Sequence, residues 1–182
     1  MWRISHSGSL NSVGDMMRNG AVLDTGFLIT LVDANRPFHE TAKAYYRHFL
    51  ENSIPMYLPT VVVSEFCLKQ PITDLPLHNF QVLPFNLFDA VRCAGLNVAT
   101  YRKQIGEGQR DAVKDDFKII AQAEENDTSF LVTEDRNSMS RYCESLRIDG
   151  EIRIRVIELS MGFDLSRLND DGQLEIEYPP VV

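Results

Sequence analysis

The sequence predicts a single α/β domain built on a mainly parallel sheet. Short apolar runs of strand-like composition alternate along the chain with stretches of about 10 to 20 residues that have helical periodicity. Strands separated by helices of that length form βαβ units, which place neighbouring strands parallel. The chain has 182 residues, which suits one well-packed domain but not two.

Proline positions and apolar runs mark the elements of the first half of the chain. Pro37 precedes an amphipathic stretch, and Pro71 and Pro76 interrupt the chain after a run of β-branched residues. We predict strands at 21–24, 55–59 and 79–85, with helices that begin near Phe27, span 38–51, begin near Thr60 and span 87–104.

The second half begins after GEGQR (106–110), which is typical of a flexible connection. We predict helices at 113–125 and 138–146, and strands at 129–133 and 151–159, the last at an edge of the sheet. Residues 1–19 then form an N-terminal extension, 20–159 the domain, and 160–182 an acidic tail. We expect this tail to be a solvated or edge-pairing appendage.

Composition excludes several classes of protein. The net charge of -8 argues against a protein that coats nucleic acid, unless bound ions cancel some of the acids. The three cysteines have no zinc-site spacing, so we expect buried thiols in a reducing cytoplasm. No apolar run has the length of a membrane span, and the first 20 residues do not resemble a signal peptide, so we expect a cytoplasmic protein.

Four carboxylates lie where an apolar run ends and the chain leaves a strand or enters a helix. They are Asp24, Glu65, Asp116 and Asp135. Ligands of parallel sheets bind at the carboxyl ends of the strands, so these acids are candidates for one site. The alternative interpretation for each acid is local: a helix cap, an Asx turn or a structural ion pair.

Asp116 is the most informative of the four. With Ile119, Ile120 and Ala123 it shares one face of its predicted helix, so its side chain is expected to face the sheet. Asp115 lies about 100° around that helix and is expected to face solvent or support the site. A carboxylate beside isoleucines normally neutralises, pairs or binds a metal ion.

Convergence of four carboxylates requires compensation. Two such charges about 4 Å apart repel by about 4 kcal/mol at an effective dielectric constant of about 20. A bound cation, raised pKa values or basic neighbours must offset this repulsion. A set of oxygen ligands favours Mg²⁺ or Mn²⁺ over zinc.

With these residues in view, residues 20–158 resemble the PIN-domain nucleases. The order matches the family: VLDTGFLI at Asp24, VVSEF at Glu65, DFKIIAQA at Asp116 and LVTEDRN at Asp135. The resemblance implies a three-layer α/β/α fold and metal-dependent hydrolysis of phosphodiester bonds, mostly in single-stranded RNA, by an endoribonuclease.

The resemblance also implies roles for individual residues. Asp24, Glu65 and Asp116 would bind the ion, and Asp135 would complete the set. The supporting residues would be Thr25, Asp115, Thr133 and Asn137. The chain departs from the family at Gly26, where Asn or Ser is commoner, and at Asn137, where many members carry another acid.

RNA binding needs cations, and several lie near the predicted site. They are Arg102, Lys103, Arg110, Lys114 and Arg136. Their alternative interpretation is an ordinary solvated helix surface. The aromatic residues of the helix at 38–51 are open to two interpretations, a homodimer or partner face and simple core packing.

Three further alternatives remain open from sequence. A PIN-like binding or assembly module would keep the acids with little or no activity. A haloacid-dehalogenase-like phosphatase would need an acid two residues after Asp24, where this chain has Gly26. Within the nuclease interpretation, the protein is either a toxin held silent by a small antitoxin-like partner or a stand-alone enzyme.

Overall fold

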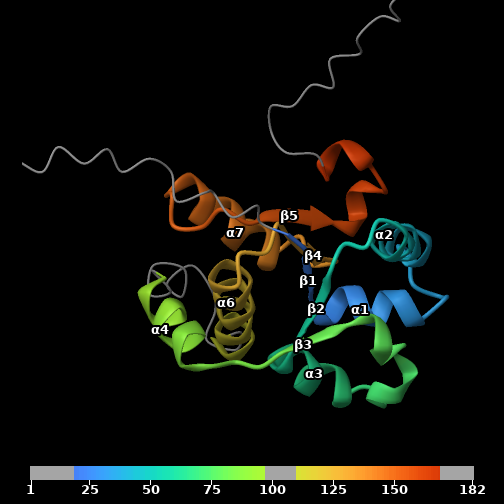
Figure 1. The fold of residues 1–182 in the computed structure, drawn as a ribbon, viewed down its shortest axis with the longest axis horizontal. Helices are drawn as coiled ribbons and strands as arrows, with labels where there is room; N and C mark the ends of the chain where they lie inside the picture. The colour runs from blue at the N-terminus through green and yellow to red at the C-terminus, as the bar shows by residue number, and fades with distance from the viewer. Residues whose placement is uncertain (1–18, 97–109, 169–182) are drawn as a thin grey trace, which may run out of the picture.

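The computed structural model describes residues 19–96 and 110–168. For residues 110–112 it describes the helix backbone but not the side chains. A sheet of five parallel strands runs through the middle of the molecule in the order β3-β2-β1-β4-β5 (Figure 1). The strands are β1 (Ala21–Leu23), β2 (Met56–Pro59), β3 (Gln81–Leu83), β4 (Phe130–Thr133) and β5 (Arg155–Glu158). The sheet confirms the predicted parallel α/β class.

Helices cover both faces of the sheet, which gives the predicted three layers. They are α1 (Thr25–Val32), α2 (His39–Glu51), α3 (Thr60–Cys67), α4 (Leu87–Gly95), α6 (Arg110–Glu125) and α7 (Met139–Ile148). In Figure 1, α4, α6 and α7 lie on one side of the sheet, with α1 and α2 on the other. Short 3-10 turns follow at Ile72–Asp74, Leu77–Asn79, Leu159–Met161 and Leu165–Arg167.

The central strand β1 is buried on both faces because helices cover the sheet on both sides. Its three residues have no exposed surface, and Phe27 and Leu28 of the following helix are equally buried. Helix α1 is apolar nearly all round, as expected for a helix enclosed by other elements. Each fully buried Leu or Phe side chain stabilises the fold by roughly 1.5–3 kcal/mol.

The sheet order brings two sequence-distant strand ends together at the centre. Leu23 at the end of β1 pairs with Val132 of β4, and the Asp24 backbone N–H donates to the Val132 carbonyl at 3.1 Å. The segments that follow these two strands therefore leave the sheet side by side. They carry Asp24 and Asp135.

Most predicted elements are found close to their expected bounds, with a few differences. The strand expected at 151–159 is restricted to β5 because the backbone N–H groups of Arg153 and Ile154 donate to the Glu124 carboxylate. The helix expected at 113–125 begins earlier, at Arg110. The helix expected at 87–104 ends at Gly95, and residues 97–104 lie outside the described residues.

We expected a solvated or edge-pairing appendage after β5; residues 162–164 contact Tyr45 of α2, while most of 160–168 is exposed. Phe163 meets the ring of Tyr45 edge-on, with ring centroids 4.9 Å apart. The Tyr45 hydroxyl donates to the Gly162 carbonyl at 3.2 Å and accepts from the Asp164 N–H at 3.2 Å. Residues from 169 onwards lie outside the described part of the chain.

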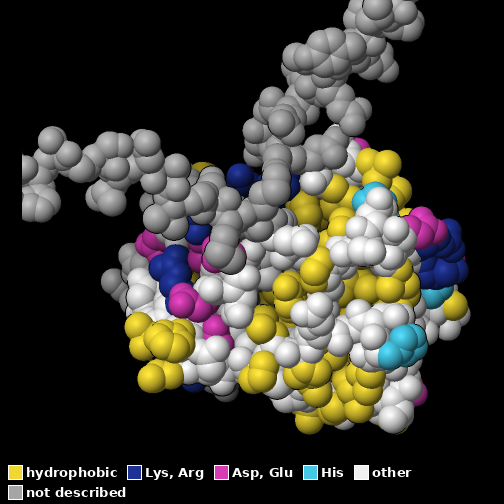
Figure 2. Space-filling model, in the orientation of Figure 1, with side chains coloured by type: hydrophobic (Ala, Val, Ile, Leu, Met, Phe, Trp, Pro, Cys, Tyr) yellow, Lys and Arg dark blue, Asp and Glu magenta, His cyan; other side chains and the backbone are white. Residues whose placement is uncertain are grey.

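Most aromatic residues at 38–51 pack in the core. For these residues, core packing rather than a homodimer or partner face is the correct interpretation. Tyr45 and Phe49 are fully buried, while Phe38 and Tyr46 are partly buried against the core. Tyr45 and Phe49 therefore cannot form the dimer or partner face. On the face drawn in Figure 2, one group of exposed hydrophobic side chains lies over α4, and further groups lie over the part of the molecule that contains α1, α2 and α3.

The cysteines are not uniformly buried as expected. Cys143 is buried, but Cys93 is half-buried and Cys67 is exposed. Cys67 follows the fully buried Phe66 on α3, and successive helical residues are turned about 100° apart, which carries the Cys67 thiol away from the core. Among the described residues, no helix has the length and apolar character needed to cross a membrane.

Candidate carboxylate site

Asp24 lies directly after β1 and caps the N-terminus of α1. Its Oδ1 accepts a hydrogen bond from the Phe27 N–H at 2.6 Å, and its Oδ2 accepts one from the Thr133 hydroxyl. The side chain is only 5% exposed. The capping interpretation therefore holds for Asp24, yet its carboxylate also lines a cavity with the three other predicted acids.

Glu65 reaches the same cavity from α3. Its carboxylate accepts a hydrogen bond from the hydroxyl of Thr25, the first residue of α1. The two residues are 40 positions apart in sequence. The two threonines, Thr25 and Thr133, thus each hold one of the carboxylates.

Asp116 projects into the cavity from α6, as its helical face predicted. Ile119 and Ile120, on the same side of the helix, are nearly fully buried. Asp115 lies outside the cavity lining and forms an ion pair with Lys118 at 2.7 Å. The structure therefore separates the two adjacent acids into one cavity residue and one surface residue.

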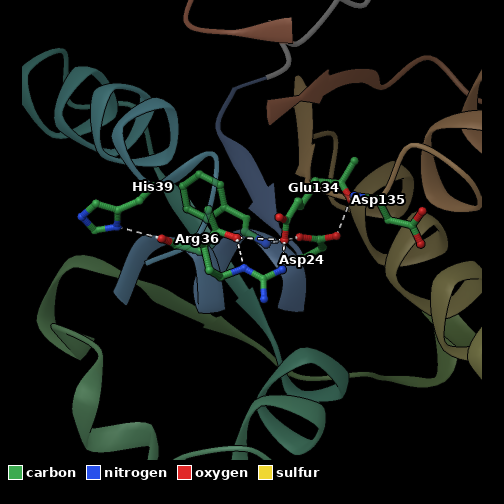
Figure 3. A network of polar contacts seen from close by, with 8 residues as sticks. Asp24, Arg36, His39, Glu134 and Asp135 are labelled. Atoms are coloured by element: carbon green, nitrogen blue, oxygen red, sulfur yellow. Dashed lines mark hydrogen bonds and ion pairs between the residues drawn. The ribbon is translucent and has the colours of Figure 1, made fainter. Parts of the chain in front are cut away.

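Asp135 is exposed and organises the turn into α7. Its Oδ1 accepts from the N–H groups of Asn137 and Ser138 at 2.7 and 3.0 Å, and the Ser138 hydroxyl donates to Oδ2. Its own N–H donates to the Thr133 hydroxyl at 2.8 Å. Thr133 therefore links Asp24 to the Asp135 backbone (Figure 3).

All four predicted acids face one cavity of about 620 Å³. Its lining comprises Asp24, Thr25, Gly26, Phe38, Glu65, Leu68, Lys69, Asp116, Ile119, Glu134, Asp135 and Met139. Asn137 is exposed and does not line it. The carboxylates thus come from four separate elements at the carboxyl edge of the sheet, the usual ligand position in such folds.

Of the five predicted RNA-binding residues, the structure describes the side chains of two, Arg136 and Lys114, and neither lines the cavity. Arg136 is exposed, with its Nε 3.8 Å from a Glu158 carboxylate oxygen. Lys114 is exposed on α6. Arg102 and Lys103, and the side chain of Arg110, lie outside what the structure describes.

Sequence reasoning missed a second polar network beside the acids. Glu134 lines the cavity and pairs with Arg36, while the Thr30 hydroxyl donates to Glu134 at 2.9 Å (Figure 3). The Arg36 Nε donates to the same hydroxyl oxygen at 2.9 Å. Lys69 was also missed; it follows α3 and lies on the cavity wall.

Burial raises the pKa of two of the carboxylates. The pKa of Asp24 rises from 3.8 to about 7, chiefly because burial disfavours the charged form, and nearby Asp116 and Asp135 raise it further. The hydrogen bonds from Thr133 and the Phe27 N–H oppose this rise. The pKa of Asp116 also rises to about 7 through burial, with repulsion from Asp135, Glu65 and Asp115 added and a Ser138 hydrogen bond opposing.

The donor set has the chemistry of a site for a hard divalent cation. All four acids offer oxygen ligands, and raised pKa values are the expected state of crowded carboxylates without a compensating charge. As placed, however, no three His, Cys, Asp or Glu side chains within 19–96 and 110–168 are grouped closely enough to hold a metal ion. Threonine hydroxyls engage Asp24 and Glu65 instead.

Comparison with known proteins identifies the fold. No protein family model and no curated sequence matches the chain. The crystal structure of VapBC2 from Rickettsia felis, bound to a DNA fragment from its promoter, matches with a TM-score of 0.50 and 12% identity. The match covers 76% of this chain and 97% of that chain. The fold is PIN-like.

Two other solved structures give lower scores. DNA-bound VapBC from Salmonella typhimurium has a TM-score of 0.47 and 16% identity, over 78% of this chain and 98% of that chain. VapC20 from Mycobacterium tuberculosis, a sarcin-ricin loop cleaving toxin, has a TM-score of 0.48 and 12% identity, over 69% of this chain and 95% of that chain. The PIN-like assignment therefore rests on the first structure and on the sheet topology.

Proposed function

We propose that the protein is a metal-dependent endoribonuclease that hydrolyses phosphodiester bonds of single-stranded RNA. The observation that carries the proposal is the convergence of four carboxylates, from four elements, on one cavity at the carboxyl edge of a PIN-like sheet. Asp24, Glu65, Asp116 and Asp135 would hold the ion, which we propose is Mg²⁺ or Mn²⁺. When bound, it would supply the positive charge that activates water and offsets charge developing on phosphoryl oxygens.

The hydrogen bonds of the site favour charged, oriented carboxylates. Thr133 and the Phe27 N–H both donate to Asp24 and lower its pKa, which opposes the effect of burial. The nearby Ser138 hydroxyl, which donates to Asp135, also lowers the pKa of Asp116. A pKa near 7 leaves each group able to lose its proton near neutral pH, when a cation or a water molecule approaches.

A phosphatase of the haloacid-dehalogenase type fits these residues less well. That chemistry needs a general acid two residues after the nucleophilic aspartate, and the position is occupied by Gly26. A Cβ at that position would lie only 3.3 Å from the Glu134 Cβ, so there is little room for a larger side chain.

A PIN-like binding module remains the second candidate, because the described carboxylates are not grouped as a ready-made metal site.

The fold likeness to a VapBC complex also leads us to propose a small antitoxin-like protein as a partner. In that setting the chain would be a ribonuclease toxin that is silent in the complex.

The direct test uses purified protein and a mixed pool of single-stranded RNA, with Mn²⁺, Mg²⁺ or EDTA. We expect cleavage with either metal, none with EDTA, and none by the Asp24→Asn variant. Metal-dependent RNA binding without cleavage would support the binding module. Equal cleavage by Asp24→Asn and the wild type would overturn the assignment of the site.

A further inference from the structure

Arg36 does not itself line the carboxylate cavity, but it pairs with Glu134, which does. Arg36 lies in the connection between α1 and α2, 98 positions before its ion-pair partner Glu134. Its Nε donates to the Thr30 hydroxyl oxygen at 2.9 Å, and its Nη2 contacts the Glu134 carboxylate. Thr30 also donates to Glu134 at 2.9 Å, so the three side chains form a closed triangle (Figure 3).

Neighbouring groups fix this triangle from both sides. Residue 26 is glycine, which lets α1 approach Glu134: an added Cβ would lie 3.3 Å from the Glu134 Cβ. On the other side, His39 Nδ1 lies 2.9 Å from the Thr30 carbonyl oxygen and ties the start of α2 to α1. The position of the Arg36 guanidinium is therefore set by contacts with α1 and with the segment after β4.

The contribution of the Arg36–Glu134 ion pair to folding stability does not by itself explain why these two residues are present. The Glu134 side chain is 15% exposed and the Arg36 side chain 36%, and pairs with this degree of exposure contribute about 0–1 kcal/mol. Glu134 also adds a carboxylate to a cavity that already contains four. Apolar side chains of similar volume would often be as stable as such a pair.

The guanidinium keeps donors available for a ligand. Arginine has five N–H donors in a planar fork. The contacts to Thr30 and Glu134 use the Nε and Nη2 atoms, and Nη1 makes no contact with the residues drawn in Figure 3. A fork of this kind matches two oxygens of one phosphate, and a carboxylate-lined cavity needs such a cation to accept an anionic chain.

We propose that Arg36 is a substrate-positioning residue that binds a backbone phosphate of RNA at the edge of the cavity. Thr30 and Glu134 hold its guanidinium in the orientation that the phosphate requires. This inference rests on the proposed ribonuclease function. It adds a cation that is fixed in place next to the acids, unlike Arg136, whose side chain is 74% exposed.

The test measures RNA binding separately from cleavage. In the Asp24→Asn background, the Kd for a fluorescent single-stranded RNA is measured by anisotropy at several salt concentrations between 50 and 200 mM. We expect Arg36→Ala to weaken binding about tenfold, as for loss of one charge-assisted contact, and to reduce the salt dependence by roughly one phosphate contact. Arg36→Lys keeps the charge but loses the fork, so we expect about threefold weakening.

The matched control is Arg153→Ala, which removes another ion-paired arginine. Arg153 pairs with Glu124 in the last turn of α6 and with Asp127 just after it, and none of the three lines the cavity. Its Kd should equal that of the background. In the protein with Asp24 intact, Arg36→Lys should raise KM and leave kcat within about twofold.

The possible results separate the two proposals. If the wild type cleaves RNA but both Arg36 variants bind with unchanged Kd, the ion pair is structural only and this inference is wrong. If the wild type neither binds nor cleaves single-stranded RNA, the proposed function fails and this inference fails with it. Should Arg36→Ala not fold, the Kd of Arg36→Lys decides.

Discussion

At the scale of single residues, Asp24 has two roles that a local interpretation would treat as alternatives. It caps α1 through the Phe27 N–H, and it is buried beside other acids with a pKa near 7. The pKa of a capping carboxylate on the surface would not be raised, because a helix N-terminus favours the charged form of the group. The raised pKa therefore comes from burial in a shared cavity and carries information about the site.

The pKa of Asp24 predicts how stability depends on pH in the absence of metal. The unfolded chain titrates this group near 3.8 and the folded chain near 7, so between these values the folded state holds more protons. The free energy of unfolding should then fall as pH rises from about 4 to 7, by at most about 4 kcal/mol from this group. Asp116 acts in the same direction.

Asp24→Asn should remove much of this dependence. In EDTA at pH 8 we expect the variant to be more stable than the wild type by roughly 1–3 kcal/mol, since it loses a charge but also weakens hydrogen bonds. Thermal melts at pH 5 and pH 8 provide the measurement. A variant that is less stable than the wild type at pH 8 would show that Asp24 does not carry a destabilising charge.

Thr133 is predicted to support the site through its hydroxyl. Thr133→Val removes the donor to Asp24 and the acceptor of the Asp135 N–H. We expect a loss of about 1–3 kcal/mol in stability and a shift of the pH–rate profile to higher pH, because the hydrogen bond no longer lowers the pKa of Asp24. Thr128→Val, at a buried hydroxyl that donates to the Ala123 carbonyl, is the control: it should cost stability without moving the profile.

At the scale of elements, the segment that follows β5 is part of the domain. Its link to α2 is the Tyr45 hydroxyl, which bonds to the backbone of Gly162 and Asp164. Tyr45→Phe should cost about 1 kcal/mol and increase amide exchange in 159–168, since the ring contact with Phe163 remains but the hydrogen bonds are lost. Unchanged exchange there would mean that the aromatic contacts alone hold the segment.

The elements were predictable from the chain to a large extent because their signals are local. Apolar runs that end in an acid gave β1 and β4, and the spacing of Asp116 from Ile119 and Ile120 gave the buried side of α6. The limits of β5 were not predictable, because a distant carboxylate, that of Glu124, takes the N–H groups of the preceding residues.

The Arg36–Glu134 pair shows what the sequence could not provide for the site. The two residues are 98 positions apart, and although Glu134 follows β4 directly, as Asp24 follows β1, no sequence pattern marks Arg36 as its partner. Their contact depends on the order of strands β1 and β4 in the sheet. Strand order is a tertiary property that helix and strand patterns do not determine.

At the scale of the whole molecule, an acidic protein is proposed to bind an acidic polymer. The net charge is -8, and several of the acids converge on the proposed site. A divalent ion would neutralise part of this negative charge locally, and the fixed guanidinium of Arg36 would neutralise a further part. Binding of RNA should therefore depend strongly on both metal and salt concentration.

Metal binding should also stabilise the entire fold. Mn²⁺ at about 100 times its Kd should raise the free energy of unfolding by about 2.7 kcal/mol at pH 7.5, since only the folded chain assembles the four acids. Differential scanning fluorimetry with Mn²⁺, and with Ca²⁺ for comparison, measures the shift. Asp116→Asn should lose the shift, and a full shift in that variant would place the ion elsewhere.

The most direct measurement of the central claim compares two adjacent acids. Asp115→Asn and Asp116→Asn change the same charge on neighbouring residues of α6, but only Asp116 lines the cavity. The cleavage rate of a labelled single-stranded RNA in Mn²⁺ should fall by at least about 100-fold in Asp116→Asn. It should stay within about threefold of the wild type in Asp115→Asn. Equal rates in the two variants, or a greater loss in Asp115→Asn, would contradict the carboxylate site described by this fold.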